Sequence, residues 1–141
     1  MVIPLYTPMH QNDNIIIKDV MATTKVNGVM LKKVYDVATL MGIIECTKFV
    51  MSMRLHTLVY AVSVGVPIIG LTYDPKVSFF VEYAGQKSHV DTSNLDKNKL
   101  INMMENIMDN HGLISSKVKI RASELKKLSS EDAKKAIELI I

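Results

Sequence analysis

Apolar residues along the chain fall into short clusters that alternate between the repeat of a strand and the repeat of a helix. Val37, Leu40, Met41 and Ile44 follow an i, i+3, i+4, i+7 spacing, which predicts a helix with one apolar face. Short apolar runs between such segments predict strands, and the run at residues 67–72 is apolar on both faces. The pattern predicts five strands, each followed by a helix, at residues 2–6, 28–31, 48–53, 67–72 and 88–90.

Polar residues and glycines mark where the predicted helices begin and end. Gly65 suits the position just after a helix over residues 55–64. Asp96 suits the amino-terminal cap of a later helix. The last helix is expected to begin at one of the serines at 115–116, and the pair at 129–130 is expected to break it in two.

Alternation of strand and helix is typical of an α/β protein with a parallel sheet. We therefore expect a parallel sheet of about five strands with helices on both faces and the run at 67–72 in its centre. The 141 residues suit one domain, and a hydrophobic fraction of 48% can fill its core. Ligands of such sheets bind beyond the carboxyl ends of the strands, so the residues that follow each strand are the first candidates for a site.

Charge and composition argue against several classes of partner. The net charge is +3 with acidic and basic residues mixed, a balance too weak to indicate nucleic-acid binding. The longest apolar run, residues 58–71, is interrupted by glycine and proline and is shorter than the roughly 20 residues of a membrane helix. The single cysteine, Cys46, cannot form an internal disulfide and fits a reducing compartment. We expect no transmembrane segment, and a protein that is cytoplasmic or held peripherally at the inner face of the membrane.

Ser52, Arg54 and His56 form a first polar cluster, at a predicted strand-to-helix turn. The amino end of the following helix offers backbone N–H groups and a partial positive charge. Arg54 adds a planar cation that suits a carboxylate or a phosphate, and His56 could hydrogen-bond a ligand or transfer a proton. The cluster is therefore a candidate anion pocket with a proton donor beside it. Alternatively, Arg54 pairs with a surface acid and His56 covers the core.

Tyr73, Asp74 and Lys76 form a second polar cluster, after the predicted central strand. Asp74 as the cap and Pro75 at the first helical position make a good helix start, and they need no ligand. Tyr73 and Lys76 are not explained in this way, and both could point into the same crevice as Arg54. The four histidines lack the spacing of zinc ligands, and the chain has no glycine-rich phosphate loop.

The two clusters lie in the stretch MRLHTLVYAVSVGVPIIGLTYDPKV, residues 53–77, which resembles the signature of bacterial polysaccharide pyruvyl transferases. In that family a strand ends in Arg-Leu-His, a helix of small residues follows, and Gly-Val-Pro precedes a strand that ends in Tyr-Asp-Pro-Lys. The opening VIPLYTPMHQNDN, residues 2–14, resembles the segment at the family's domain crossover. The likeness extends through most of the chain, and two linked motifs are more specific than either alone.

The resemblance implies a transferase that moves pyruvate from phosphoenolpyruvate to a sugar of a cell-surface polysaccharide and leaves a cyclic ketal. The implied fold is GT-B-like, with two Rossmann-like halves that face a cleft, and residues 1–141 would form one Rossmann-like, donor-binding half. The family's arginine and histidine match Arg54 and His56, which implies that both contact the donor and that His56 acts as acid or base. The remaining motif positions would line the donor site: Ser52, Leu55, Tyr73, Asp74 and Lys76. The acceptor would be a glycan or a lipid-linked sugar, and the scheme needs no metal or other cofactor.

Members of the family are more than twice as long as this chain, which resembles their carboxyl-terminal half. We therefore expect weak or absent activity of the chain alone, and association with an amino-terminal half or with a second copy. Two other interpretations stay open, namely the nucleotide-sugar domain of a GT-B glycosyltransferase or epimerase, and a non-catalytic domain that binds a partner half. The paired motifs favour the transferase, and the chain length favours the non-catalytic domain for this polypeptide alone.

Overall fold

The computed structural model describes residues 12–23, 28–29, 31 and 35–139, and the chain divides into two compact units, Met1–Asp36 and Val37–Ile141. In the first unit, helix α1 spans Asn12–Thr23. The strand predicted at residues 2–6 lies outside the described residues. The strand predicted at 28–31 is wrong, because its three described residues belong to no strand and Val29 is 62% exposed. The single domain expected over residues 1–141 stays a prediction.

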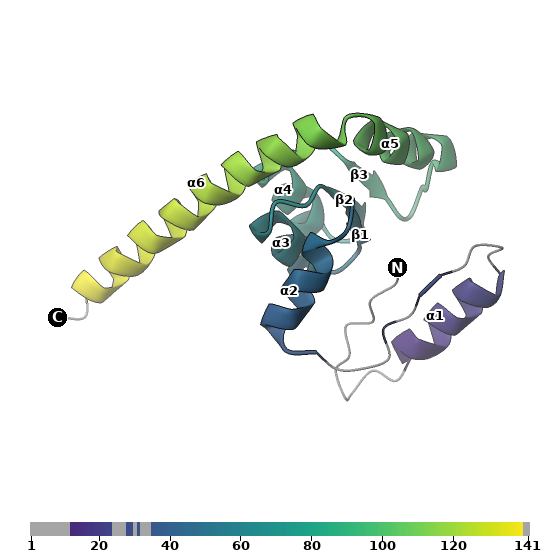
Figure 1. Ribbon diagram of the computed structural model, residues 1–141, viewed down its shortest axis with the longest axis horizontal. Helices are drawn as coiled ribbons and strands as arrows, with labels where there is room; N and C mark the ends of the chain where they lie inside the picture. Colours follow the sequence, from purple (N-terminus) through teal and green to yellow (C-terminus); the bar gives the residue numbers. More distant parts are fainter. Residues whose placement is uncertain (1–11, 24–27, 30, 32–34, 140–141) are drawn as a thin grey trace. The chain divides into compact units, whose positions relative to one another are not determined.

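The second unit carries a parallel sheet with flanking helices (Figure 1). Its elements, in chain order, are α2 (Val37–Glu45), β1 (Val50–Ser52), α3 (Leu55–Ser63), β2 (Ile68–Thr72), α4 (Pro75–Tyr83), β3 (His89–Asp91), α5 (Lys97–Asp109) and α6 (His111–Glu138). The sheet order is β1-β2-β3, and both pairings are parallel. The prediction of an α/β fold with a parallel sheet and a central strand at 67–72 is therefore confirmed, with three strands in the described part of the chain where five were expected.

Helices α3 and α4 are the crossovers that make the sheet parallel. Each leaves one strand and returns to the next strand in the same direction, and right-handed crossovers of this kind place both helices on the same face. The two helices accordingly contact each other, and both contact β2. The carboxyl ends of all three strands therefore lie along one edge of the sheet, and each of the first two runs directly into the amino end of a helix.

Gly70 in β2 sets the distance between the central strand and α4. Ile68 and Ile69 point to opposite faces of the strand, and both are fully buried. At Gly70 the side chains of Val77 and Val81 approach so closely that a Cβ atom would lie 2.8 Å from Cγ2 of Val81. Because the strand has no side chain here, α4 can pack directly against its backbone. This contact fixes the first turn of α4 over the end of β2.

The helix ends predicted from glycine and aspartate are confirmed. Gly65 follows α3 with a φ of +79°, a conformation that side chains rarely adopt. Asp96 caps α5, since its carboxylate accepts hydrogen bonds from the backbone N–H groups of Asn98 (2.9 Å) and Lys99 (3.0 Å). These residues act within one helical turn, which is why the sequence alone is sufficient to locate them.

The predictions for the last helix are wrong, because its serines do not cap or break it. Helix α6 begins at His111 and continues through both serine pairs to Glu138. The hydroxyl groups of Ser116 and Ser130 each donate to the carbonyl group four residues earlier, a bond that keeps serine within a helix. Figure 1 shows the carboxyl-terminal part of α6 extending beyond the other helices of its unit. No helix in the described part of the chain is both long and apolar enough to cross a membrane.

Candidate functional site

The two polar clusters predicted from the sequence lie at the carboxyl edge of the sheet. Ser52, the last residue of β1, pairs with Gly70, and Thr72, the last residue of β2, pairs with Asp91. Arg54 follows β1 by two residues, Tyr73 and Asp74 follow β2 directly, and neighbouring strands are about 4.8 Å apart. The structure thus brings both turns to one edge. We call Ser52, Arg54, Leu55, His56, Tyr73, Asp74 and Lys76 the strand-end cluster.

Ser52 shapes the turn from β1 into α3. Its hydroxyl oxygen accepts a hydrogen bond from the backbone N–H of Arg54 at 2.9 Å. Arg54 is the N-cap of α3 with extended backbone, and its carbonyl accepts from the N–H groups of Thr57 (3.2 Å) and Leu58 (3.4 Å). The Arg54 side chain makes no capping bond. The backbone of Arg54 therefore starts the helix, and its guanidinium group takes no part in the cap.

Arg54 and His56 are exposed at the amino end of α3, and Leu55 between them is half-buried. The exposure of His56 argues against the alternative that this residue covers the core. Helix dipoles and backbone N–H groups make the amino end of a helix favourable for anions, and Arg54 adds a permanent charge there. This turn has the groups that an anionic ligand needs, at the edge of the sheet where ligands of α/β proteins bind.

The second turn, from β2 into α4, is held by contacts among its own residues. Asp74 caps the helix and accepts from the backbone N–H of Lys76 at 2.9 Å, and Pro75 occupies the first helical position, as predicted. The Lys76 ammonium lies 3.0 Å from the Asp74 carboxylate and 5.8 Å from the centre of the Tyr73 ring. Tyr73 remains 60% exposed. Lys76 therefore has partners within its turn, and its charge is shared with Asp74.

These contacts shift the ionisation of both charged groups. The backbone hydrogen bond from Lys76 is the largest cause that lowers the pKa of Asp74, and the side-chain hydrogen bond is the next. The hydrogen bond to Asp74 raises the pKa of Lys76, with the opposite charge of Asp74 as the second cause. At neutral pH the pair is fully ionised and close to neutral overall. The charge of Lys76 is therefore balanced by Asp74 within its own turn.

Asp91 is a residue of this edge that the sequence reasoning missed. It ends β3 beside Thr72. Its carboxylate accepts hydrogen bonds from the hydroxyl (2.7 Å) and the backbone N–H (2.8 Å) of Ser93, and the first of these is the larger cause that lowers its pKa. The Thr72 hydroxyl donates to the carbonyl of Val90 at 2.8 Å, which joins the ends of β2 and β3. The signal for Asp91 in the sequence is its place directly after the strand predicted at 88–90.

A metal site is not part of this edge as far as the structure describes it. Within residues 12–23, 28–29, 31 and 35–139, no group of three or more histidine, cysteine, aspartate or glutamate side chains could hold a metal ion. What the edge offers instead is a guanidinium group, an imidazole, a tyrosine and backbone N–H groups. This donor set suits the binding of an anion and the transfer of a proton.

The model of the polysaccharide pyruvyl transferase family matches residues 2–75, which is more than half of the chain. The chain belongs to this family, and the family implies a transferase. The match includes the turn at Arg54 and the second turn as far as Pro75, whereas Lys76 and everything after it lie outside. No curated protein and no solved structure matches the chain significantly.

Proposed function

We propose that this chain is the donor-binding part of a pyruvyl transferase, which moves pyruvate from phosphoenolpyruvate to two hydroxyl groups of a sugar in a cell-surface polysaccharide. The observation that carries the proposal is the position of Arg54 and His56 at the amino end of α3, on the ligand-binding edge of a parallel sheet and within the matched residues. In this proposal the second unit is one Rossmann-like half of a GT-B-like fold, with helices on both faces of its sheet.

Arg54 would hold the donor. Phosphoenolpyruvate carries a phosphate and a carboxylate, and a guanidinium group can bind either anion through two parallel hydrogen bonds. The amino end of α3 adds backbone donors and a partial positive charge at the same place. Ser52 supports this arrangement because its hydroxyl fixes the backbone of Arg54. Leu55, half-buried, anchors the turn to the core.

His56 would supply the proton that starts the reaction. A proton moves to the methylene carbon of the donor, and the adjacent carbon becomes cationic. The first sugar hydroxyl attacks this carbon and loses its proton, phosphate leaves, and the second hydroxyl attacks in the same way to close the ketal. A positioned acid–base group contributes roughly 10²–10⁴-fold to such steps. His56 is exposed in the first turn of α3, two residues after Arg54. No other histidine lies closer to Arg54 in the sequence.

Tyr73, Asp74 and Lys76 would border the donor site. Asp74 caps α4 and holds the Lys76 ammonium beside the Tyr73 ring, so the turn offers a fixed cation and an exposed phenol. In this proposal Lys76 positions the donor through its shared charge, whereas Arg54 makes the main contact. The acceptor would be a glycan or a lipid-linked sugar, as the family suggests.

The proposal is tested by titration of the chain with phosphoenolpyruvate and, separately, with UDP-sugars, followed by NMR. We expect phosphoenolpyruvate alone to shift the signals of Arg54 and His56. A response to UDP-sugars alone would identify a nucleotide-sugar domain instead. A chain that responds to neither ligand would support the non-catalytic interpretation, and the proposed function would be wrong.

Substitution of Arg54 separates binding from folding. Arg54→Ala is expected to weaken phosphoenolpyruvate binding by roughly tenfold or more, because a charge-assisted hydrogen bond is lost. Arg54→Lys keeps the charge but loses the planar fork, so an intermediate loss is expected. Lys127→Ala removes an exposed cation of α6 and serves as the control. The circular dichroism of all variants should match that of the unmodified chain, and unfolding of Arg54→Ala would show that Arg54 is structural.

A further inference from the structure

The exposed aromatic side chains gather on α4 and on the turn that precedes it. The chain has five tyrosines and three phenylalanines, and four of these eight residues lie within residues 73–83. Tyr73 is 60% exposed, Phe79 70% and Tyr83 54%, and no other aromatic residue in the described part of the chain is exposed. Large apolar side chains that are exposed together mark a binding surface, whereas scattered ones need no explanation. We call Tyr73, Phe79 and Tyr83 the aromatic row.

The aromatic row lies on the outer face of α4. The inner face of this helix is formed by Val77 and Val81, which are fully buried. Phe79 is two residues from each valine, so its side chain leaves the helix on the opposite side. Tyr83 follows Phe79 by four residues, which places the two rings on one face, about 6 Å apart along the helix axis. This distance is close to the length of one unit of a sugar chain.

The aromatic row begins at the strand-end cluster, to which Tyr73 belongs. The Lys76 ammonium lies 5.8 Å from the centre of the Tyr73 ring, and Lys76 precedes Phe79 by three residues on the same helix face. From Lys76 to Tyr83 the face extends roughly 10 Å along the axis. Phosphoenolpyruvate is too small to occupy the donor site and this face together. The face therefore suits a longer molecule, one end of which reaches the donor site.

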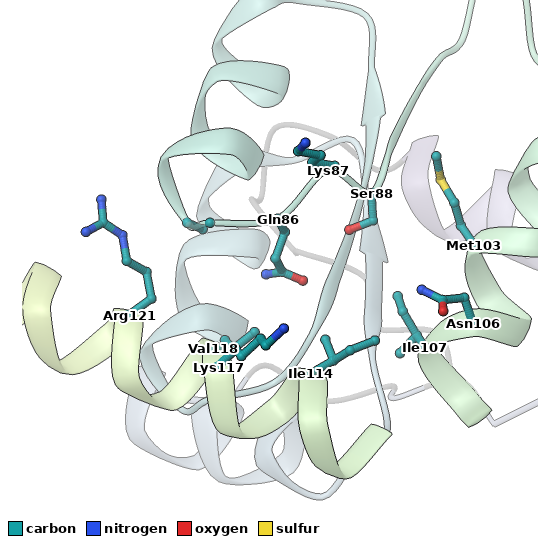
Figure 2. A pocket seen from close by; sticks show the side chains of 12 residues that line it. Gln86, Lys87, Ser88, Met103, Asn106, Ile107, Ile114, Lys117, Val118 and Arg121 are labelled. Atoms are coloured by element: carbon teal, nitrogen blue, oxygen red, sulfur yellow. The ribbon is translucent and has the colours of Figure 1, made fainter. Parts of the chain in front are cut away.

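At its far end the aromatic row borders a groove of about 560 Å³ between α3, α4 and α6. Tyr83 and Phe80 form its aromatic side. Arg121 of α6 (Figure 2) donates through Nε to the Tyr83 carbonyl at 2.9 Å, and its guanidinium group lies 5.2 Å from the centre of the Tyr83 ring. These contacts hold the ring while more than half of the residue stays exposed. A ring that is already ordered loses little freedom when a ligand packs on it.

The polar lining of the groove suits hydroxyl groups. The hydroxyls of Ser63 and Ser130 each donate to the carbonyl group four residues earlier, at 2.8 and 2.9 Å, so their lone pairs are left to accept. Asp132 adds a carboxylate, which also accepts, and Lys126 adds an opposite charge. All these residues except the donors of their own helices are exposed to a ligand. The groove therefore offers acceptors without a net charge, which suits a neutral molecule rich in hydroxyl groups.

A sugar chain combines the two properties that this surface recognises. The face of a sugar ring is made of C–H groups, which pack on an aromatic ring, and its rim carries hydroxyl groups. The family to which the chain belongs is named for a polysaccharide, and the acceptor has to reach the site where the donor is held.

We propose that the acceptor polysaccharide docks along the aromatic row, with successive sugar rings on Phe79 and Tyr83 and hydroxyl groups in the groove, so that one end of the docked segment lies at the strand-end cluster. This inference rests on the proposed function, because the row is assigned to the acceptor from its start at the donor site.

The test is an NMR titration of the chain with neutral hexasaccharides of glucose, of mannose and of galactose, without phosphoenolpyruvate. The ring signals of Phe79 and Tyr83 report on the row. We expect saturable shifts with at least one hexasaccharide, because stacking on a ring tolerates a change of sugar, and much weaker binding of free glucose, which covers one ring only. Because no donor is present, failure of this titration is distinguishable from failure of phosphoenolpyruvate to bind.

Substitution of Phe79 separates stacking from general apolar contact. Phe79→Leu keeps an apolar side chain but loses the ring, and should weaken hexasaccharide binding about three- to tenfold, whereas Phe79→Tyr keeps the ring and should bind within about twofold of the unmodified chain. Ile120→Ala removes an apolar side chain of α6 that is 64% exposed, and serves as the matched control without effect. Phe79 is 70% exposed, so the circular dichroism of its variants should match that of the unmodified chain.

Three results would refute the proposal. The first is the absence of shifts at Phe79 and Tyr83 with all three hexasaccharides. The second is equal binding by Phe79→Leu and Phe79→Tyr, which would show that the ring is irrelevant. The third comes from sedimentation: a dimer that Phe79→Leu converts to a monomer, together with no response to sugars, would show that the row is an interface between copies.

Discussion

The substitution Gly70→Ala tests whether the close contact between β2 and α4 supports the whole unit. The added Cβ atom would lie 2.8 Å from Cγ2 of Val81 and 3.1 Å from Cγ1 of Val77. Ordinary contact begins near 3.4 Å, so α4 would have to move by more than half an ångström at Val81. Both valines are fully buried and branched at Cβ, so neither can rotate away without a new clash.

The expected cost follows from two opposing effects. Overpacking of a filled core typically costs about 1–3 kcal/mol. Replacement of a glycine within a strand by alanine returns about 0.5–1 kcal/mol, because less backbone entropy is lost on folding. The net loss therefore lies between about 0 and 2.5 kcal/mol, and the contact with two buried valines favours the upper part of that range, about 1–2 kcal/mol.

The assay is urea denaturation followed by far-ultraviolet circular dichroism, with Val81→Ala as the second arm of a double-mutant cycle. Val81→Ala alone should cost about 2 kcal/mol, because a fully buried side chain loses two methyl groups. It also removes the atom that the new Cβ would meet. Gly70→Ala in the Val81→Ala background should therefore cost about 1 kcal/mol less than in the unmodified chain, since the contact with Val77 remains.

Two results would refute this reasoning. Gly70→Ala could leave the stability within about 0.5 kcal/mol of the unmodified chain, in which case α4 accommodates the methyl group without strain. Alternatively, Gly70→Ala could cost the same in both backgrounds, which would show that Val81 is not the obstacle. A changed m-value would point instead to loss of two-state unfolding.

Two further predictions concern backbone conformation and ionisation. Gly85→Ala should lower the free energy of unfolding by about 1–2 kcal/mol, because Gly85 has a φ of +73°. Gly42→Ala should raise it by about 0.5–1 kcal/mol, because a Cβ atom at this position of α2 meets open space. Thermal melts of the two variants test this, and shifts of the melting temperature in the same direction would contradict it. The Asp74 carboxyl should titrate below 3.8 in NMR, so its contribution to stability is present above that pH and is lost as the pH falls through the lowered pKa. In Lys76→Gln the pKa should remain below 3.8, because the backbone N–H of residue 76 still donates; a return to 3.8 would show that the lysine side chain is the main cause.

The features of the fold that the sequence predicted correctly depend on interactions between near neighbours. Asp74, Asp96 and Gly65 act within a single turn, and a short run that is apolar on both faces favours a central strand. The boundary of α6 depends on more distant contacts. Ser115, expected as a cap, instead donates to the carbonyl of Gly65, fifty residues away, at 2.9 Å. No local pattern in the sequence distinguishes Ser115 from a serine that caps the start of a helix.

The candidate site also has features that the sequence predicts and features that it does not. Arg54, His56 and Tyr73 were predictable because each follows a strand, and parallel strands end at one edge. The pairing of Lys76 with Asp74 was not predicted, although the two residues are neighbours in the same turn. The hydrogen bond from the backbone N–H of Ile68 to the Gln86 amide oxygen could not be predicted, because it joins residues eighteen positions apart.

The sheet joins strands that also follow one another along the chain, and this has a consequence for the rate and order of folding. Each pairing, β1 with β2 and β2 with β3, closes a loop of only about twenty residues, so little chain entropy is lost before the contacts form. During synthesis from the amino end, residues 50–91 leave the ribosome before α5 and α6 are complete. The edge that carries Arg54 and Asp74 can therefore assemble early, while the contact of α6 with α3 has to wait for the last helix.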